Sequence, residues 1–160
     1  MLAEKLLRLA QEAVAGHPDF FETKGPGPGD RATNAFMADL RARAIKAFGR
    51  DYSEKAICGA NELAVDFYLP QEGTVVEVAL GLSKPKTEFE KDVLKAVMAK
   101  EEGNAVSRLF FISKPGAKKK CAQPGRAAVI AWLERHHGIK VEIHELTSML
   151  AKNRLKVRRA

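Results

Sequence analysis

The sequence predicts an α/β fold in which one mixed central β-sheet is flanked by helices. Two apolar, β-branched segments, 63–69 and 74–80, are separated by only four residues, which predicts an antiparallel hairpin. Further along the chain, helical and strand patterns alternate, which predicts parallel strands joined by helical crossovers. With 160 residues and 46% hydrophobic content, the chain has the size and apolar content of a single domain spanning residues 1–160.

The N-terminal third is expected to be helical. Residues 2–15 place leucine and alanine side chains at helical spacing on one face. The segment 25–30 (GPGPGD) is expected to be irregular, because proline lacks a backbone donor and glycine lacks conformational restraint. A second helix then begins, with Asp30 or Thr33 as its N-cap, and runs to about Phe48.

The rest of the chain is expected to alternate between strands and helices. Residues 55–58 predict a short strand before the hairpin, and the connection 70–73 (PQEG) predicts a turn. The elements expected after the hairpin are a helix over 87–102, a strand over 108–113, a basic loop, a helix over 124–137, a strand over 139–144, and a short C-terminal helix with a basic tail. We find no internal repeat and expect no second domain.

Positive charge is concentrated in two segments. The formal net charge is +7, yet residues 103–132 contain six bases and no acid, and the last ten residues contain five bases and no acid. The remainder has 27 − 11 = 16 bases against 20 acids. A mildly acidic body with two basic segments suits a polyanion such as DNA or RNA, the alternative being segments that only aid solubility. The bases expected to contact phosphates are Lys114, Lys118, Lys119, Lys120 and Arg126.

Several classes of protein are not expected. No apolar run approaches the roughly 18 residues that span a bilayer, so we expect no membrane partner. The N-terminal segment is amphipathic and charged, unlike a secretory signal. Cys58 and Cys121 have no CxxC spacing, which disfavours a zinc site or a disulfide framework. A reducing, cytoplasmic location is therefore expected.

Two acids interrupt the apolar strands of the hairpin. Asp66 lies in LAVDFYL and Glu77 lies in VVEVAL, and counting from the turn sets them opposite each other. Cross-strand neighbours are about 5 Å apart at Cβ, so two such carboxylates repel unless a cation lies between them. Mg²⁺ favours one or two carboxylates with water and phosphate oxygens. The pattern predicts a hard-metal site for phosphate chemistry, the alternative being two acids on the solvent face of an edge hairpin.

These residues resemble the PD-(D/E)xK nuclease superfamily, which has the restriction-endonuclease-like fold. The resemblance covers roughly residues 34–113, and it is carried by Val65-Asp66-Phe67-Tyr68, by VVEVALG followed by FEKDVLKAV, and by the element order αβββαβ. The resemblance implies a Mg²⁺-dependent endonuclease acting on DNA, with Mn²⁺ able to substitute. It also implies a homodimer, because two sites then address two strands.

The resemblance implies specific roles for residues near the two acids. Asp66 and Glu77 would hold the metal, and the Val78 carbonyl would add a ligand. Glu62, four residues before Asp66 and on the same face in the strand period, is a candidate third ligand or a solvated acid at the strand end. The motif lysine is replaced by Ala79, so Lys86 is expected to substitute for it or to be merely solvated.

The absence of the motif lysine leaves other functions open. One is a catalytically inactive nucleic-acid-binding module on the same fold. Another is a protein-interaction subunit whose basic tail binds RNA or ribosomes. Metal binding would distinguish the nuclease from both, and salt-dependent DNA binding would distinguish the two alternatives from each other.

Overall fold

The computed structural model describes residues 1–21, 28–83 and 89–147. The chain divides into two compact units. The first consists of Met1–Glu4 and Tyr52–Glu145, and the second of Lys5–Asp51 and Leu146–Ala160.

The first unit is built on a five-stranded mixed β-sheet. Its strands are β1 (Ser53–Lys55), β2 (Val65–Leu69), β3 (Thr74–Glu77), β4 (Arg108–Ser113) and β5 (Lys140–Glu145), and they lie side by side in sequence order. The β1–β2 and β2–β3 pairs are antiparallel, whereas the β3–β4 and β4–β5 pairs are parallel. The predicted mixed sheet, with antiparallel pairing first and crossovers after it, is confirmed.

The connection between β2 and β3 fixes the register of the hairpin. A short 3-10 turn, Pro70–Glu72, is followed by Gly73 at a φ of +56°, a conformation that glycine adopts without steric cost. Leu69 then pairs with Thr74, which is the register that counting from the turn predicts. Every residue of β3 is buried, as expected for a strand inside a sheet.

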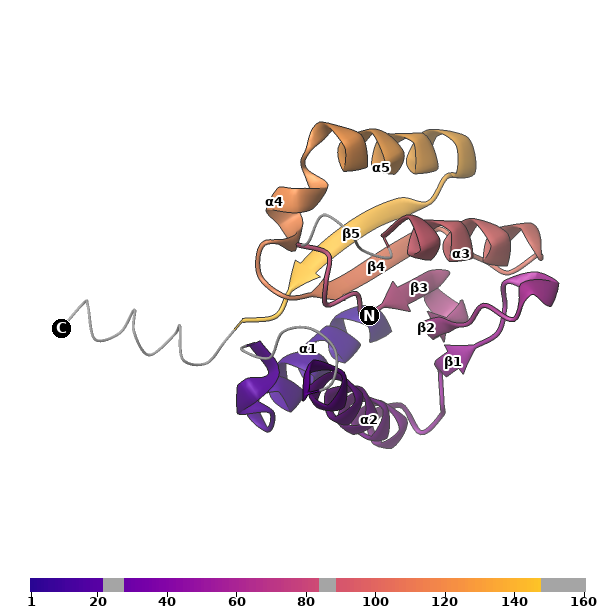
Figure 1. Cartoon of the computed structure of the whole chain (residues 1–160). Helices are drawn as coiled ribbons and strands as arrows, with labels where there is room; N and C mark the ends of the chain where they lie inside the picture. The colour runs from indigo at the N-terminus through magenta and orange to yellow at the C-terminus, as the bar shows by residue number, and fades with distance from the viewer. Residues whose placement is uncertain (22–27, 84–88, 148–160) are drawn as a thin grey trace. The chain divides into compact units, whose positions relative to one another are not determined.

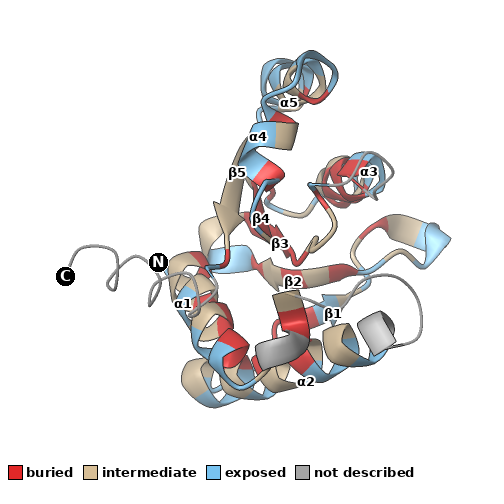
Figure 2. Ribbon diagram, turned by 60° about the vertical axis from the view of Figure 1, so that its left-hand side comes forward, coloured by how far each residue is buried: buried red, intermediate tan, exposed pale blue. Residues whose placement is uncertain are grey.

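Helices α3 (Phe89–Glu101) and α5 (Pro124–His137) lie on one face of this sheet (Figure 1). Both connect parallel strands, and right-handed crossovers between successive strands put their helices on the same side. Figure 2 shows the buried side of α3 turned toward the sheet, whereas α5 is mostly exposed or half-buried. The core of this face contains residues from the strands, from α3 and α5, and from the segments that join them: Cys58, Val65, Val75, Leu82, Phe89, Val93, Ala96, Ala99, Val106, Leu109, Phe111, Ala117, Cys121, Leu133 and Ile139.

The start of helix α1 (Leu2–Ala15) is tied to the first unit. The backbone amides of Leu2 and Ala3 both donate to the Glu72 carboxylate, so a distant side chain caps the helix N-terminus. A carboxylate is the favoured group there, because the N-terminal end of a helix carries partial positive charge. Arg108 in turn lies 3.1 Å from Glu4, which adds an ion pair next to the cap.

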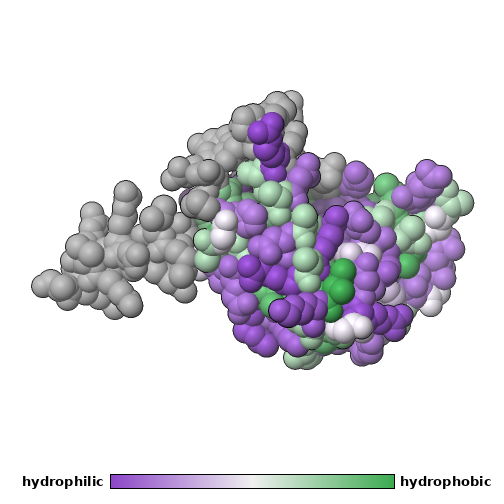
Figure 3. Space-filling view, turned by 90° about the horizontal axis from the view of Figure 1, so that it is seen from below, coloured by the Kyte–Doolittle hydropathy of each residue, from purple (hydrophilic) through white to green (hydrophobic). Residues whose placement is uncertain are grey.

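The second unit is helical. It contains most of α1, a 3-10 turn (Pro18–Phe21) and α2 (Pro28–Phe48). The side chains of Phe20 and Phe36 are buried, with ring centroids 4.5 Å apart. Asp39 forms ion pairs with Arg43 on α2 and with His17, so polar contacts also join α2 to the segment after α1. Seen from below, hydrophilic side chains dominate the surface, and apolar ones form small separate patches (Figure 3).

Several element boundaries differ from prediction. Helix α2 begins at Pro28, inside the segment expected to be irregular, because proline at the first helical position costs no backbone hydrogen bond. The first strand lies at Ser53–Lys55, before the expected position, and β3 stops at Glu77 rather than at residue 80. The loop expected after β4 contains a short helix, α4 (Ala117–Cys121). The predicted C-terminal helix and tail lie outside the described residues.

The other boundaries agree with prediction, or nearly so. Helices α1 and α5 and strand β4 have the predicted bounds, and β5 is shifted by one residue. No described helix is both long enough and apolar enough to cross a membrane.

Candidate active site

The hairpin register brings Asp66 and Glu77 together. Phe67 pairs with Val76 in this antiparallel hairpin, so the residue before Phe67, Asp66, lies opposite the residue after Val76, Glu77. Residues directly opposite in an antiparallel pair point to the same side of the sheet. Asp66 Oδ2 also accepts a hydrogen bond from the Val78 amide at 2.7 Å, which anchors its carboxylate at the end of β3.

Helix α3 adds two charged side chains that the sequence analysis did not single out. Lys95 Nζ lies 2.8 Å from Glu77 Oε1 and 2.8 Å from Asp92 Oδ1. It also donates to the Ala64 carbonyl at 3.3 Å. We call Asp66, Glu77, Asp92 and Lys95 the acid–lysine cluster. It joins the hairpin to the helix that covers it.

Most of the acid–lysine cluster is withdrawn from water. Glu77 is 2% exposed, Asp92 4% and Lys95 6%, whereas Asp66 is half-buried. Burial of ionised groups is unfavourable unless they are paired. The alternative in which both acids face solvent on an edge hairpin is therefore wrong for Glu77, and the hairpin is not at the edge, because β1 and β4 pair with its two strands.

The environment of Glu77 disfavours its charged form. Burial, with added repulsion from the Asp66 and Asp92 carboxylates, raises the pKa of Glu77 to about 9, against the opposing effect of Lys95. For Lys95, burial alone would lower the pKa, but the two carboxylates outweigh it, so the pKa of its ammonium group lies above the ordinary value. Glu77 therefore gives up its proton less readily than an ordinary glutamate side chain, whereas Lys95 keeps its charge.

One oxygen in the cluster is incompletely satisfied. Glu77 Oε1 is at ion-pair distance from Lys95 Nζ, yet it receives no well-directed hydrogen bond from the described part of the chain. The cluster also contains three acids and one base. A buried site with surplus carboxylates and an under-bonded oxygen is suited to a further cation.

The donors present fit a hard divalent cation in part. Carboxylate oxygens from Asp66 and Glu77 are the type of ligand that Mg²⁺ prefers, and Mg²⁺ often completes its shell with waters and phosphate oxygens. Within the described ranges, no group of three or more His, Cys, Asp or Glu side chains is arranged to hold a metal ion. The carboxylates of Asp66 and Glu77 are thus the donors that could hold such an ion.

The other residues predicted near the metal have varied positions. Val78 is buried directly after β3, and the Ala79 carbonyl accepts a hydrogen bond from Ser113 Oγ at 2.6 Å. Glu62 is exposed and precedes β2 in a left-handed conformation, with φ of +62°, so the strand period does not extend to it. Its role as a ligand stays a prediction. Lys86 lies outside the described residues.

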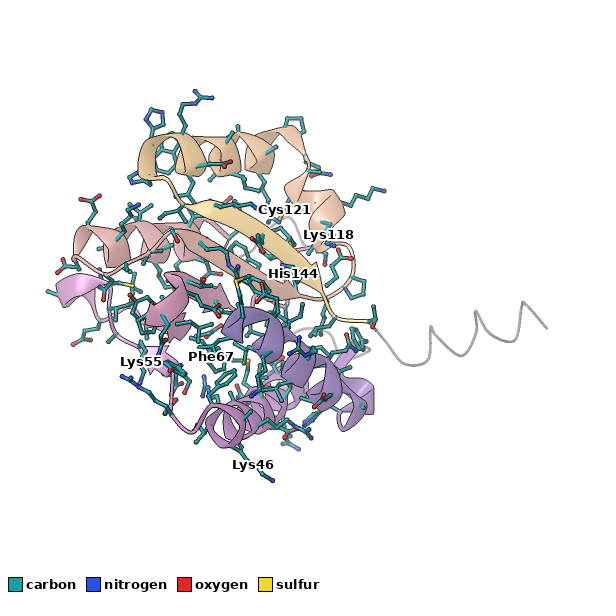
Figure 4. The ribbon with its side chains drawn as sticks, turned by 180° about the vertical axis from the view of Figure 1, so that it is seen from behind. Lys46, Lys55, Phe67, Lys118, Cys121 and His144 are labelled. Atoms are coloured by element: carbon teal, nitrogen blue, oxygen red, sulfur yellow. The ribbon has the colours of Figure 1, made fainter. Side chains whose placement is uncertain are left out.

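The residues predicted to contact nucleic acid follow β4. They are Lys114, Lys118, Lys119, Lys120 and Arg126. Lys118 and Lys119 are exposed on α4, and Lys118 is labelled in Figure 4. The short helix is held by Glu145, whose Oε1 accepts hydrogen bonds from the backbone amides of Gly116 and Lys118 at 3.0 and 2.8 Å. This arrangement presents adjacent lysine side chains from a fixed backbone.

Arg126 differs from these lysines because its side chain is buried. Its guanidinium donates to the Leu82 carbonyl and lies 5.1 Å from the centroid of the Phe89 ring. Arg126 therefore holds the segment after β3 against α3 and α5. Its contact with a phosphate stays a prediction, and its buried contacts with Leu82 and Phe89 stabilise the packing of the first unit.

The two candidate regions lie toward the same end of the sheet. Glu77 is the last residue of β3, and α4 follows the carboxyl end of β4, which is parallel to β3. Figure 1 shows α4 beside the carboxyl ends of the parallel strands. In open α/β sheets this end is where ligands commonly bind.

Comparison with known proteins returned no match. No family model, no curated protein and no solved structure matches the chain. The functional assignment therefore rests on the residues and their geometry.

Proposed function

We propose that the protein is a metal-dependent nuclease that hydrolyses phosphodiester bonds in DNA. The observation that carries the proposal is Glu77, a buried carboxylate at a strand end with its pKa raised to about 9, set opposite a second acid, Asp66. A second carboxyl group beside a buried one is unfavourable for stability alone, and such strongly perturbed acids cluster at functional sites. The basic segment after β4 provides the charge that a nucleic-acid backbone needs.

Each of these residues would have a specific role. Asp66 and Glu77 would hold the metal, and the Val78 carbonyl would be a further ligand. A bound Mg²⁺ or Mn²⁺ supplies Lewis-acid polarisation of the phosphoryl group and a lowered pKa for an attacking water. Lys118 and Lys119 would contact backbone phosphates and position the strand, since lysine binds phosphate as a flexible point charge.

A second function is supported by a specific observation. Ala79 occupies the position of the motif lysine, and three protein oxygens already surround Lys95, the nearest lysine described. A scaffold with no free ammonium group at the site would bind nucleic acid without cleaving it. The second candidate is therefore a catalytically inactive nucleic-acid-binding module on the same fold.

Plasmid nicking separates the two functions. Supercoiled DNA is incubated with Mn²⁺ and the parent protein, Asp66→Asn, Glu77→Gln, or Glu101→Gln, an exposed acid on α3 that serves as the matched control. The proposal expects nicking by the parent and the control, abolished by EDTA, and at least about 100-fold slower nicking by the two site variants. Equal cutting by all four proteins would show that the site is assigned wrongly.

Binding assays address the alternative. An inactive module expects no nicking by any variant, but DNA binding in EDTA that weakens steeply as salt is raised. Parallel assays with RNA of the same length identify the preferred nucleic acid. Sedimentation of the parent protein tests whether it is a homodimer.

A further inference from the structure

The Lys95 ammonium group lies among oxygens contributed by three different parts of the first unit. Glu77 comes from the end of β3, Asp92 from the preceding turn of α3, and the Ala64 carbonyl from the segment before β2. An ammonium group has three N–H donors, and three oxygens lie within 3.3 Å of it, although its contact with Glu77 is an ion pair without a well-directed hydrogen bond. Lys95 therefore acts as a small cation within a coordination shell made by the protein.

The position of this ammonium group matters because a metal would use one of the same oxygens. Glu77 is both a candidate metal ligand and the direct partner of Lys95, at 2.8 Å. Two positive groups that share one buried carboxylate repel each other strongly, because screening by water is weak there. Conversely, without any cation the acids of the cluster would repel each other.

We propose that Lys95 is a built-in counter-ion that stabilises the metal-free acid–lysine cluster and competes with a divalent cation for it. This inference rests on the proposed function, since it takes Glu77 as a metal ligand. It assigns Lys95 as a positioning residue that holds the Glu77 carboxylate in place until a metal binds. It makes the free protein stable at the expense of metal affinity.

The inference predicts opposite effects on folding and on metal binding. Replacing Lys95 by methionine keeps much of the side-chain length but removes the charge. In EDTA, Lys95→Met should be less stable than the parent, because buried acids lose their partner. Its affinity for Mn²⁺, measured by calorimetry or by the electron paramagnetic resonance signal of the free ion, should rise by about tenfold or more.

A matched control is available on the same helix. Lys100 is half-buried on α3, and its Nζ donates to the His137 carbonyl rather than to an acid of the cluster. Lys100→Met should lose some stability without changing Mn²⁺ affinity. Comparing Lys95→Met with Lys100→Met separates the effect of the charge at the site from the general effect of removing a partly or fully buried amine.

A measurement on the parent protein guards against a variant that does not fold. The side-chain ¹⁵N resonance of Lys95 should shift when Mg²⁺ is added, whereas that of Lys100 should not. An unchanged Lys95 resonance while Mg²⁺ binds would overturn the inference, as would Mn²⁺ binding to Lys95→Met that is equal to or weaker than binding to the parent. In both cases the metal site itself would survive.

Failure of the proposed function has a different result. If neither the parent nor Lys95→Met binds Mn²⁺, and Asp66→Asn behaves like both, no metal site exists at the cluster. That outcome overturns the inference and the nuclease proposal together.

Discussion

The stability of the metal-free protein should fall as pH rises, and Glu77 should be the cause. Its pKa is 4.5 in an unfolded chain and about 9 in the folded protein. Between these values the folded protein binds one proton more than the unfolded chain does at this position. The contribution of Glu77 to stability is thus fully present below pH 4.5 and is lost progressively up to about pH 9.

The magnitude follows from the proton count. One extra proton bound by the folded state changes the free energy of unfolding by about 1.4 kcal/mol per pH unit. Between about pH 6 and pH 8, the parent should therefore lose up to roughly 3 kcal/mol relative to Glu77→Gln, which has the same shape but does not titrate. The pKa of Lys95 lies above its ordinary value, so its charge stays constant in this range.

The assay is urea denaturation of both proteins in EDTA at several pH values. Every other ionisable side chain is present in both proteins, so its effect cancels in the difference. The groups that face Glu77 are Asp66 from β2 and Asp92 and Lys95 from α3. If the parent and Glu77→Gln lose stability in parallel, Glu77 is ionised in the folded protein and the electrostatic account of the cluster is wrong.

Three further predictions concern folding. Gly73→Ala should destabilise the protein by about 1 kcal/mol or more beyond the effect of Gly49→Ala. Both glycines have positive φ, but an added Cβ would meet Ser107 Oγ at 3.0 Å at Gly73 and would meet nothing within 4 Å at Gly49, and equal melting temperatures of the two variants would contradict this reasoning. Phe89→Ala should cost roughly 3–5 kcal/mol in denaturant, since its ring is fully buried in the core of the first unit, and a loss below about 1 kcal/mol would show that the ring is not packed there. Glu72→Ala should cost about 1 kcal/mol and speed hydrogen exchange at the start of α1, whereas unchanged exchange would show that Glu72 is not its cap.

Much of the fold could be predicted because local patterns and tertiary packing agree. The apolar stripe of α1 and the buried run RLFFIS of β4 each have one reasonable interpretation, and both elements have the predicted bounds. Strand β3 was predicted too long because Val78 reads as a strand residue. In the structure its amide binds the Asp66 carboxylate, and the chain leaves the sheet at that point.

The short helix α4 illustrates a limit of local signals. Its sequence, AKKKC, follows a proline and a glycine, and those residues predict a loop. The helix starts immediately after Gly116, which has a φ of +96°, a left-handed conformation that glycine adopts without steric cost. Its backbone is then held by Glu145, a contact across 29 residues that no local pattern reveals.

The candidate site was predictable only where it depended on strand register. Counting across the turn was enough to set Asp66 opposite Glu77. Asp92 and Lys95 were missed because FEKDVLKAV was taken only as the helix that follows the two acidic strands. The available signal was an acid and a base three residues apart on the side of the apolar face of that helix, beside Phe89 and Ala96.

The two cysteines make the packing of the first unit accessible to kinetic measurement. Cys58 is fully buried under α3, its Sγ donating to the Lys95 carbonyl at 3.4 Å, and Cys121 is 3% exposed on α4. Burial raises the pKa of both thiols, so neither should react with a maleimide while its helix stays in place. Each alkylation rate would then report how often that helix lifts from the sheet. A ligand that binds beside Lys95 should slow labelling of Cys58 more than labelling of Cys121.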